Sequence, residues 1–195
     1  MTLAQKIQTI GYILNELEVA ILRTGNLRNG YRVDRVAGMV SSNSFCSYGH
    51  DLDNLFKHVP GFPDMSLDFG NILQLCNELS PSLLTDYEKL VKTMVYLEQT
   101  IGEENYYSAG QYTPDLEALH TSIKDAMCNF DRLESQCVPS QSSLNSTDLV
   151  RNYEQTTNDE ERHIRDYLLV KDIHILLQGF WVKYNKCHIL FNDAY

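Results

Sequence analysis

Four segments of the chain place apolar residues at alternating steps of three and four, the spacing of an amphipathic α-helix, and polar stretches separate them. The spacing predicts helices over about 3–23, 67–101, 114–137 and 159–191. No segment alternates with the two-residue period of a β-strand. We therefore expect an all-α protein, and a length of 195 residues favours one domain over 1–195.

The lengths of the links predict how these helices are connected. The first link has about forty residues and the third about twenty, whereas the middle link has about a dozen. A short link reverses the chain, while a long link can return it so that the next helix runs in the same direction. We therefore expect a long-chain four-helix bundle with up-up-down-down topology and two long crossover loops, as in growth-hormone and cytokine bundles.

Short motifs predict where the helices begin and end. The run TGN at 24–26 is a typical C-terminal signal after the first helix, and Gly102 follows the second. The run TPD at 113–115 predicts the start of the third helix with a proline at its first position. The pair ND at 158–159 predicts the capped start of the fourth.

Charge and motif content exclude several classes of function. The net charge of −10 argues against nucleic acid and anionic membranes as partners, because an acidic surface repels phosphate groups. No apolar run of about eighteen residues is available for membrane insertion. The first residues do not form a signal peptide, so we expect a leader removed from a precursor, or leaderless export. No nucleophile arrangement and no glycine-rich phosphate loop occur, so we expect neither an enzyme nor a cofactor.

Five cysteines and one sequon bear on the compartment of the protein. Cys76 and Cys128 fall on predicted apolar helix faces, where we expect buried free thiols. Cys46 and Cys137 lie in or beside loops and are better candidates for a disulfide. Asn145 begins an Asn-Ser-Thr sequon in the third link, a predicted glycosylation site of a secreted protein.

Three predicted helices contain the segments CNELSPSLLTDYEKLVKTMVYLEQ, TPDLEALHTSIKDAMCNFDRLES and DYLLVKDIHILLQGFWVKYNK. These segments resemble the interleukin-6 family of helical cytokines, in particular the ciliary neurotrophic factor and cardiotrophin-like cytokine branch. The likeness covers most of the chain outside the two long loops. It implies a secreted, extracellular signalling ligand that binds and bridges cell-surface receptor chains, including a shared signal-transducing receptor on the outer faces of the first and third helices.

The resemblance also implies contacts for a specific receptor subunit near the end of the last helix. The family's aromatic-x-x-Arg motif falls on Phe180-Trp181-Val182-Lys183, where Lys stands in place of Arg. A Lys side chain offers a single point charge, whereas an Arg side chain can make a two-pronged contact. The expected contact residues are Phe180, Trp181, Lys183, Tyr184 and Lys186.

A third receptor is expected at the start of the last helix and the neighbouring loop. Counting back from Phe180, the family's Phe-x-x-Lys pair falls on Ile164 and Tyr167, and the nearest literal match runs from Leu168 to Lys171. The expected contact residues are Ile164, Tyr167, Leu168, Lys171, Phe56 and Phe62.

Three alternatives remain open at this point. The chain is also compatible with a cytokine α subunit that acts with a soluble receptor-like partner, or with an intracellular helical binding module that has five reduced thiols. The third alternative is a di-metal bundle, because Glu117/His120 and Glu160/His163 have the Glu-x-x-His spacing of di-iron proteins. Further ligands for such a metal site would come from Glu16, Glu18, Glu78 or Glu88, which fall outside the apolar stripes, so we favour no metal.

Overall fold

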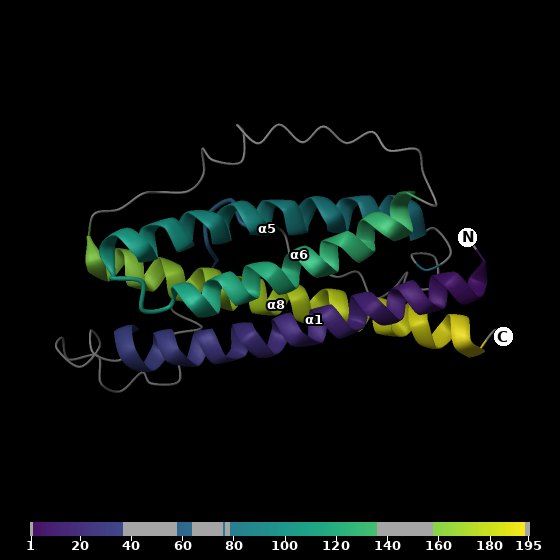
Figure 1. Cartoon of the computed structure of the whole chain (residues 1–195), viewed down its shortest axis with the longest axis horizontal. Helices are drawn as coiled ribbons and strands as arrows, with labels where there is room; N and C mark the ends of the chain where they lie inside the picture. The colour runs from purple at the N-terminus through teal and green to yellow at the C-terminus, as the bar shows by residue number, and fades with distance from the viewer. Residues whose placement is uncertain (1, 37–57, 64–75, 77–78, 136–157, 194–195) are drawn as a thin grey trace.

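A computed structural model describes residues 2–36, 58–63, 76, 79–135 and 158–193. Within these residues the chain has four α-helices and no strand, which confirms the predicted all-α class. The helices are α1 (Leu3–Tyr31), α5 (Leu79–Tyr107), α6 (Thr113–Ser135) and α8 (Asp159–Asp193) (Figure 1). A π-helical turn, η1 (Arg32–Val36), continues α1.

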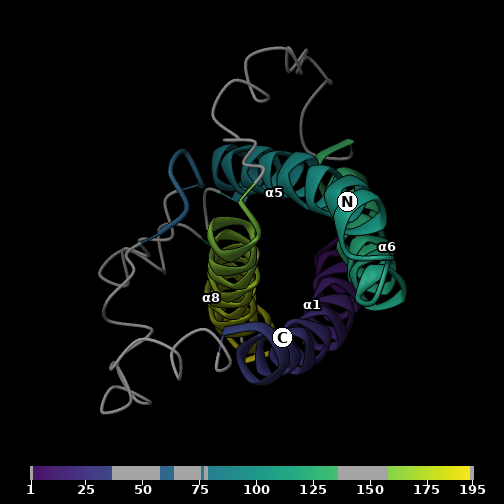
Figure 2. The same ribbon diagram turned by 90° about the vertical axis from the view of Figure 1, so that its left-hand side faces the viewer.

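The four helices form a ring. α1 packs against α6 and α8, and α5 packs against α6 and touches α8. Figure 2, which looks along the bundle, shows the order α1, α6, α5, α8 around its axis. α1 and α5 therefore lie on opposite sides of the ring, as do α6 and α8.

Contacts between helix termini show which ends lie together. Tyr31 at the end of α1 stacks on Tyr112, directly before α6, with ring centroids 4.5 Å apart. Arg162 in the first turn of α8 lies over the ring of Tyr107 at the end of α5. The last turns of α1 and α5 thus meet the first turns of α6 and α8, and we call this the network end. The two chain termini lie at the opposite end (Figure 1).

The predicted apolar stripes meet in one core along the axis of the bundle. Each helix contributes several side chains that are less than 3% exposed. They include Ile10, Ile13 and Leu17 of α1, Leu83, Leu90 and Leu97 of α5, Leu116, Leu119, Ile123 and Phe130 of α6, and Leu169, Ile173, Leu176 and Phe180 of α8.

The predicted ends of the first two helices are wrong. α1 continues through the run at 24–26 to Tyr31, and α5 continues past Gly102 to Tyr107. Gly30 of α1 is a packing position, because a methyl group there would lie 2.9 Å from the ring of Tyr112, whereas a methyl group on Gly25 would make an ordinary contact of 3.8 Å with His174. Tertiary contact therefore overrides the local stop signal.

The predicted starts of the last two helices agree with the structure. α6 begins at Thr113, and α8 begins at Asp159. The side chain of Asn158 accepts a hydrogen bond of 3.0 Å from the backbone N–H of Glu160, which confirms the predicted cap. Five residues, 108–112, connect α5 to α6 through a turn in which Ala109 and Gly110 have positive φ.

The segment 58–63 is fastened to α8 and α5. The buried carboxylate of Asp172 lies 2.8 Å from His58 Nδ1 and accepts a 2.8 Å hydrogen bond from the backbone N–H of Val59. The hydroxyl of Tyr96 donates to the carbonyl oxygen of Pro60. This segment therefore covers a side of α8 that the other helices leave open.

The cysteine predictions need correction. Cys76 and Cys187 form a disulfide that joins residues 111 positions apart, so Cys76 is not a free thiol. Cys128 is free but exposed, where a buried position was expected. Closing a loop of this length stabilises a fold by about 5 kcal/mol in the chain-entropy model. Helical periodicity cannot reveal this pairing, because it carries no information on which distant residues meet.

Candidate functional site

The structure separates the predicted contact residues near the end of α8 into two groups. Phe180 and Tyr184 are each 1% exposed and Lys183 is 7% exposed, which leaves them little surface for a partner. Trp181 is half-buried against the core, and Lys186 is exposed. A receptor at this position would therefore contact Trp181 and Lys186.

Lys183 has an internal role instead. Its ammonium group binds the carboxylate of Asp86 and the hydroxyl of Ser82, both on α5. The hydroxyl of Tyr184 donates a 2.7 Å hydrogen bond to Asp86, and burial followed by the charge of Asp86 raises the pKa of Tyr184. Lys183 is therefore a buried cation and not the surface cation that we expected. Local sequence could not predict this, because its partner Asp86 lies 97 residues earlier in the chain.

The predicted contact residues at the start of α8 are mostly internal. Tyr167, Leu168 and Lys171 are buried, and Ile164 packs partly against the core. They fall in or next to Asp166–Ile173, a run in which every residue is buried. This part of α8 has no open outer face, because the segment 58–63 covers it in addition to the neighbouring helices.

Phe62 also faces inward. Its ring packs against that of Tyr96, with centroids 5.9 Å apart. The predicted loop contact, glycosylation site and loop disulfide candidates lie outside the described residues: Phe56, Asn145, Cys46 and Cys137.

The network end holds a cluster of buried charges. Arg35 of η1 forms a two-pronged ion pair with Glu104 of α5, at N···O distances of 2.6 and 2.8 Å. Its guanidinium lies beside the stacked rings of Tyr31 and Tyr112, less than 5 Å from each centroid. The backbone N–H of Tyr112 also donates to Glu104. These contacts fasten α1, α5 and the start of α6 together.

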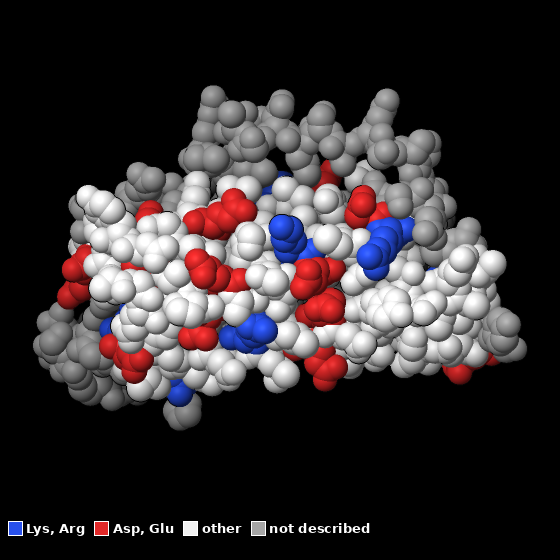
Figure 3. All heavy atoms as spheres, viewed as in Figure 1, with Lys and Arg blue, Asp and Glu red and all other residues white. Residues whose placement is uncertain are grey.

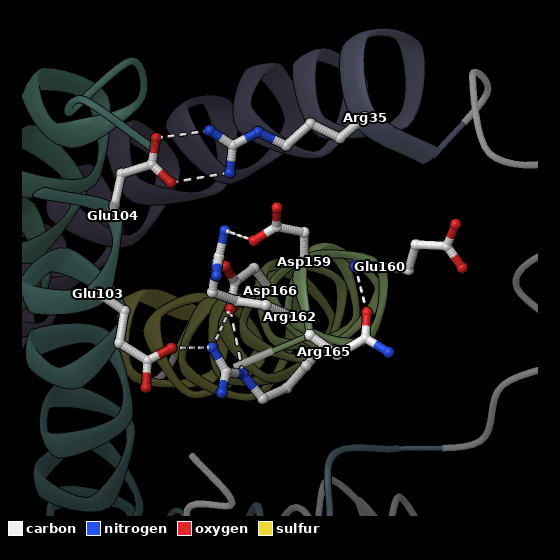
Figure 4. A network of polar contacts seen from close by, with 9 residues as sticks. Arg35, Glu103, Glu104, Asp159, Glu160, Arg162, Arg165 and Asp166 are labelled. Carbon is white, nitrogen blue, oxygen red and sulfur yellow. Dashed lines mark hydrogen bonds and ion pairs between the residues drawn. The ribbon is translucent and has the colours of Figure 1, made fainter. Parts of the chain in front are cut away.

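The α8 side of this cluster contains Arg162, Arg165 and Asp166 (Figure 4). Arg165 donates hydrogen bonds to Asp166 and to Glu103 of α5. Arg162 donates a hydrogen bond of 2.7 Å to Asp159. Burial raises the pKa of Asp166 from its ordinary value of 3.8 to about 6, and Arg165 opposes the shift. The bundle therefore encloses a carboxyl group that takes up a proton under mildly acidic conditions.

Exposed apolar side chains gather on the outer face of α1. Tyr12, Val19 and Leu22 are 47%, 40% and 65% exposed, and their spacing of seven and three residues puts them on one side of the helix. The face of the molecule in Figure 3 carries acidic and basic side chains with uncharged surface between them. Helical periodicity contained the signal for these residues, because they interrupt the polar side of the first helix.

A second group of exposed apolar side chains lies at the network end. Tyr106 is 81% exposed and packs edge-to-face against Tyr107, which is 45% exposed. Val33 of η1 is 64% exposed. In the sequence the tyrosines form an aromatic pair inside a polar stretch, and they are not among the predicted contact residues.

In the Glu-x-x-His pairs of the di-metal alternative, both glutamates are exposed, whereas His120 and His163 are half-buried. His120 Nε2 is 3.0 Å from a carboxylate oxygen of Glu98, and Glu117 is exposed. Glu160 is exposed at the start of α8. In the part of the chain that the structure describes, no three His, Cys, Asp or Glu side chains converge on a metal position.

Comparison with protein-family models, curated proteins and solved structures finds no match for this chain. Among the described helices, none has the length and apolar content to cross a membrane. The candidate site therefore rests on the geometry of the bundle and its exposed side chains.

Proposed function

We propose that the chain is a secreted signalling ligand of the long-chain helical cytokine type, which binds and bridges receptors of the interleukin-6 kind. The observation that carries this proposal is the pair of separate apolar surfaces, on α1 and at the network end, of a four-helix bundle. Exposed aromatic and aliphatic side chains are typical anchors of protein interfaces. Two such surfaces on one rigid body allow one ligand to hold two receptor chains together.

The helix directions support an up-up-down-down connection with two long crossovers. The ends of α1 and α5 lie together, so these two helices run the same way, and α6 and α8 run back. Only the five-residue link between α5 and α6 is short. This connection is found in growth-hormone and cytokine bundles.

The disulfide supports an extracellular location. Disulfides persist in oxidising compartments and are rare in the cytosol. Cys76 and Cys187 are 4% and 1% exposed, so the bond is an internal part of the bundle. An intracellular binding module with reduced thiols is disfavoured on this ground.

Each surface has a proposed receptor. The shared signal-transducing receptor binds the outer face of α1 around Leu22, and the third receptor binds the network end around Tyr106 and Tyr107. The specific subunit contacts Trp181 and Lys186. The positions of the shared receptor and of the third receptor are chosen from the exposed apolar residues of the structure. The position of the specific subunit is chosen from the predicted contact residues near the end of α8 that are not fully buried.

The test is binding of the purified chain to the extracellular segment of the shared receptor, measured by surface plasmon resonance. It is run alone, with a specific receptor subunit, and with a soluble receptor-like subunit. Binding that appears only with the soluble subunit identifies a cytokine α subunit. Absence of binding in all three arms, from protein with the Cys76–Cys187 bond intact, contradicts the proposal.

A further inference from the structure

The network end contains buried polar atoms that the ion pairs leave without partners. Four of the seven such atoms in the described residues are the Tyr31 hydroxyl, Arg162 Nε and Nη1, and Asp166 Oδ2, and the other three belong to Gln99, Ser108 and His163. Tyr31, Arg162 and Asp166 are at most 2% exposed. Buried polar groups in native proteins are nearly always hydrogen-bonded, and one that is not costs free energy.

These atoms lie close to one another. Arg162 and Asp166 are one turn apart on α8, so their side chains share a face of the helix. In Figure 4 both lie between the Arg35–Glu104 pair and Arg165. Tyr31 belongs to the same cluster, because its ring centroid lies 4.9 Å from the guanidinium carbon of Arg35. In agreement with this position, the charge of Asp166 is, after burial, the largest influence that raises the pKa of Tyr31.

The set of groups selects the kind of ligand. Arg162 offers only N–H donors, Asp166 offers an acceptor, and Tyr31 offers both. The carboxylates of Asp166 and Glu104 oppose an anion, and the guanidinium groups of Arg162 and Arg35 oppose a cation. A small neutral molecule that both donates and accepts satisfies all of them.

We propose that Tyr31, Arg162 and Asp166 bind one or more internal water molecules that connect α1 to α8 at the network end. Water is the one abundant ligand with this donor and acceptor capacity, and buried waters in proteins make about three hydrogen bonds to such groups. The bound water completes the set of contacts that hold the first turn of α8 against the end of α1. It gives this end of the bundle a hydrated polar interior in place of an apolar one.

The test uses the intact chain and a conservative pair of variants. Two-dimensional NMR records cross-peaks between long-lived water and the Arg162 Nε–H. Tyr31→Phe removes one partner of the water and preserves the ring, and Tyr12→Phe makes the same change at an exposed position of α1.

We expect a water cross-peak in the unmodified chain, and a fall of about 2–4 °C in Tm for Tyr31→Phe with none for Tyr12→Phe. Absence of a long-lived water at Arg162 contradicts the proposal. So does an unchanged or raised Tm for Tyr31→Phe, because deleting a hydroxyl that lacks any partner is neutral or stabilising. The NMR measurement on the unmodified chain decides the question independently of how either variant folds.

Discussion

Single residues inside the bundle set how its stability depends on pH. Ionised Asp166 is destabilised by burial, so its folded-state pKa of about 6 lies above its ordinary value of 3.8. The folded protein therefore holds a proton between about pH 6 and 4 that the unfolded chain has lost, and the contribution of Asp166 to stability rises as pH falls through this window. His163 and His174 act in the opposite sense, because burial lowers the pKa of each.

Asp166→Asn should stabilise the protein at pH 7.5, because it removes a buried charge while Arg165 keeps Glu103 as a partner. The expected gain is up to about 3 kcal/mol, and it should vanish near pH 4. Urea unfolding at several pH values measures it, with the exposed Asp131→Asn as a control. Equal gains at pH 7.5 and pH 4 would show that the titration of Asp166 is not the cause.

Lys183 provides a second residue-scale prediction. Lys183→Met should destabilise the protein by about 3 kcal/mol or more, because Asp86 then remains buried and charged without its cation. Adding Asp86→Asn should restore most of the loss, since the amide oxygen can still accept from Tyr184. Chemical denaturation of the unmodified chain, the two single variants Lys183→Met and Asp86→Asn, and the double variant measures the coupling, with the exposed Lys186→Met as the matched control. A loss no larger than that of the control would contradict an internal role for Lys183.

At the scale of helices, two glycines that lie inside helices have opposite roles. Gly30→Ala should destabilise the protein by about 1 kcal/mol or more, because the new methyl group would displace a Tyr112 ring held by Tyr31 and Arg35. Gly102→Ala should stabilise it by about 0.5–1 kcal/mol, because nothing lies within 4 Å and alanine favours helix. Thermal unfolding of both variants measures the difference, and effects of the same sign would contradict this interpretation.

Helical spacing and caps predicted the four helices found in the described residues, the start of α6 and α8 and most of the core, because these features depend on neighbouring residues. The end of α1 could not be predicted in the same way, since Gly30 is determined by Tyr112. The partner of Lys183 on α5 and the partner of Cys76 on α8 also come from distant parts of the sequence. Of the residues predicted to contact a receptor at the end of α8, Lys186 is exposed, Trp181 is half-buried and Lys183 is buried. Their contact with a receptor stays a prediction.

At the scale of the whole molecule, a buried ionic cluster closes the network end of the bundle. Near the opposite end, a disulfide fastens residue 76 to α8. A ligand that joins receptor chains gains from such rigidity, because little conformational freedom is lost when each receptor binds. Under the proposed function, the exposed residues of α1 and of the network end would act as separate anchors for two receptor chains. The proposed function depends most on the α1 face, which we propose binds the shared signal-transducing receptor.

The most direct measurement is the affinity of the Leu22→Asp variant for the extracellular segment of that receptor. Ile189→Asp of α8 is the matched control, because it introduces the same charge at another exposed aliphatic position. We expect Leu22→Asp to weaken binding at least tenfold, about 1.4 kcal/mol, with unchanged circular dichroism, and Ile189→Asp to leave this affinity unchanged. Equal affinities of both variants and the unmodified chain would contradict the claim.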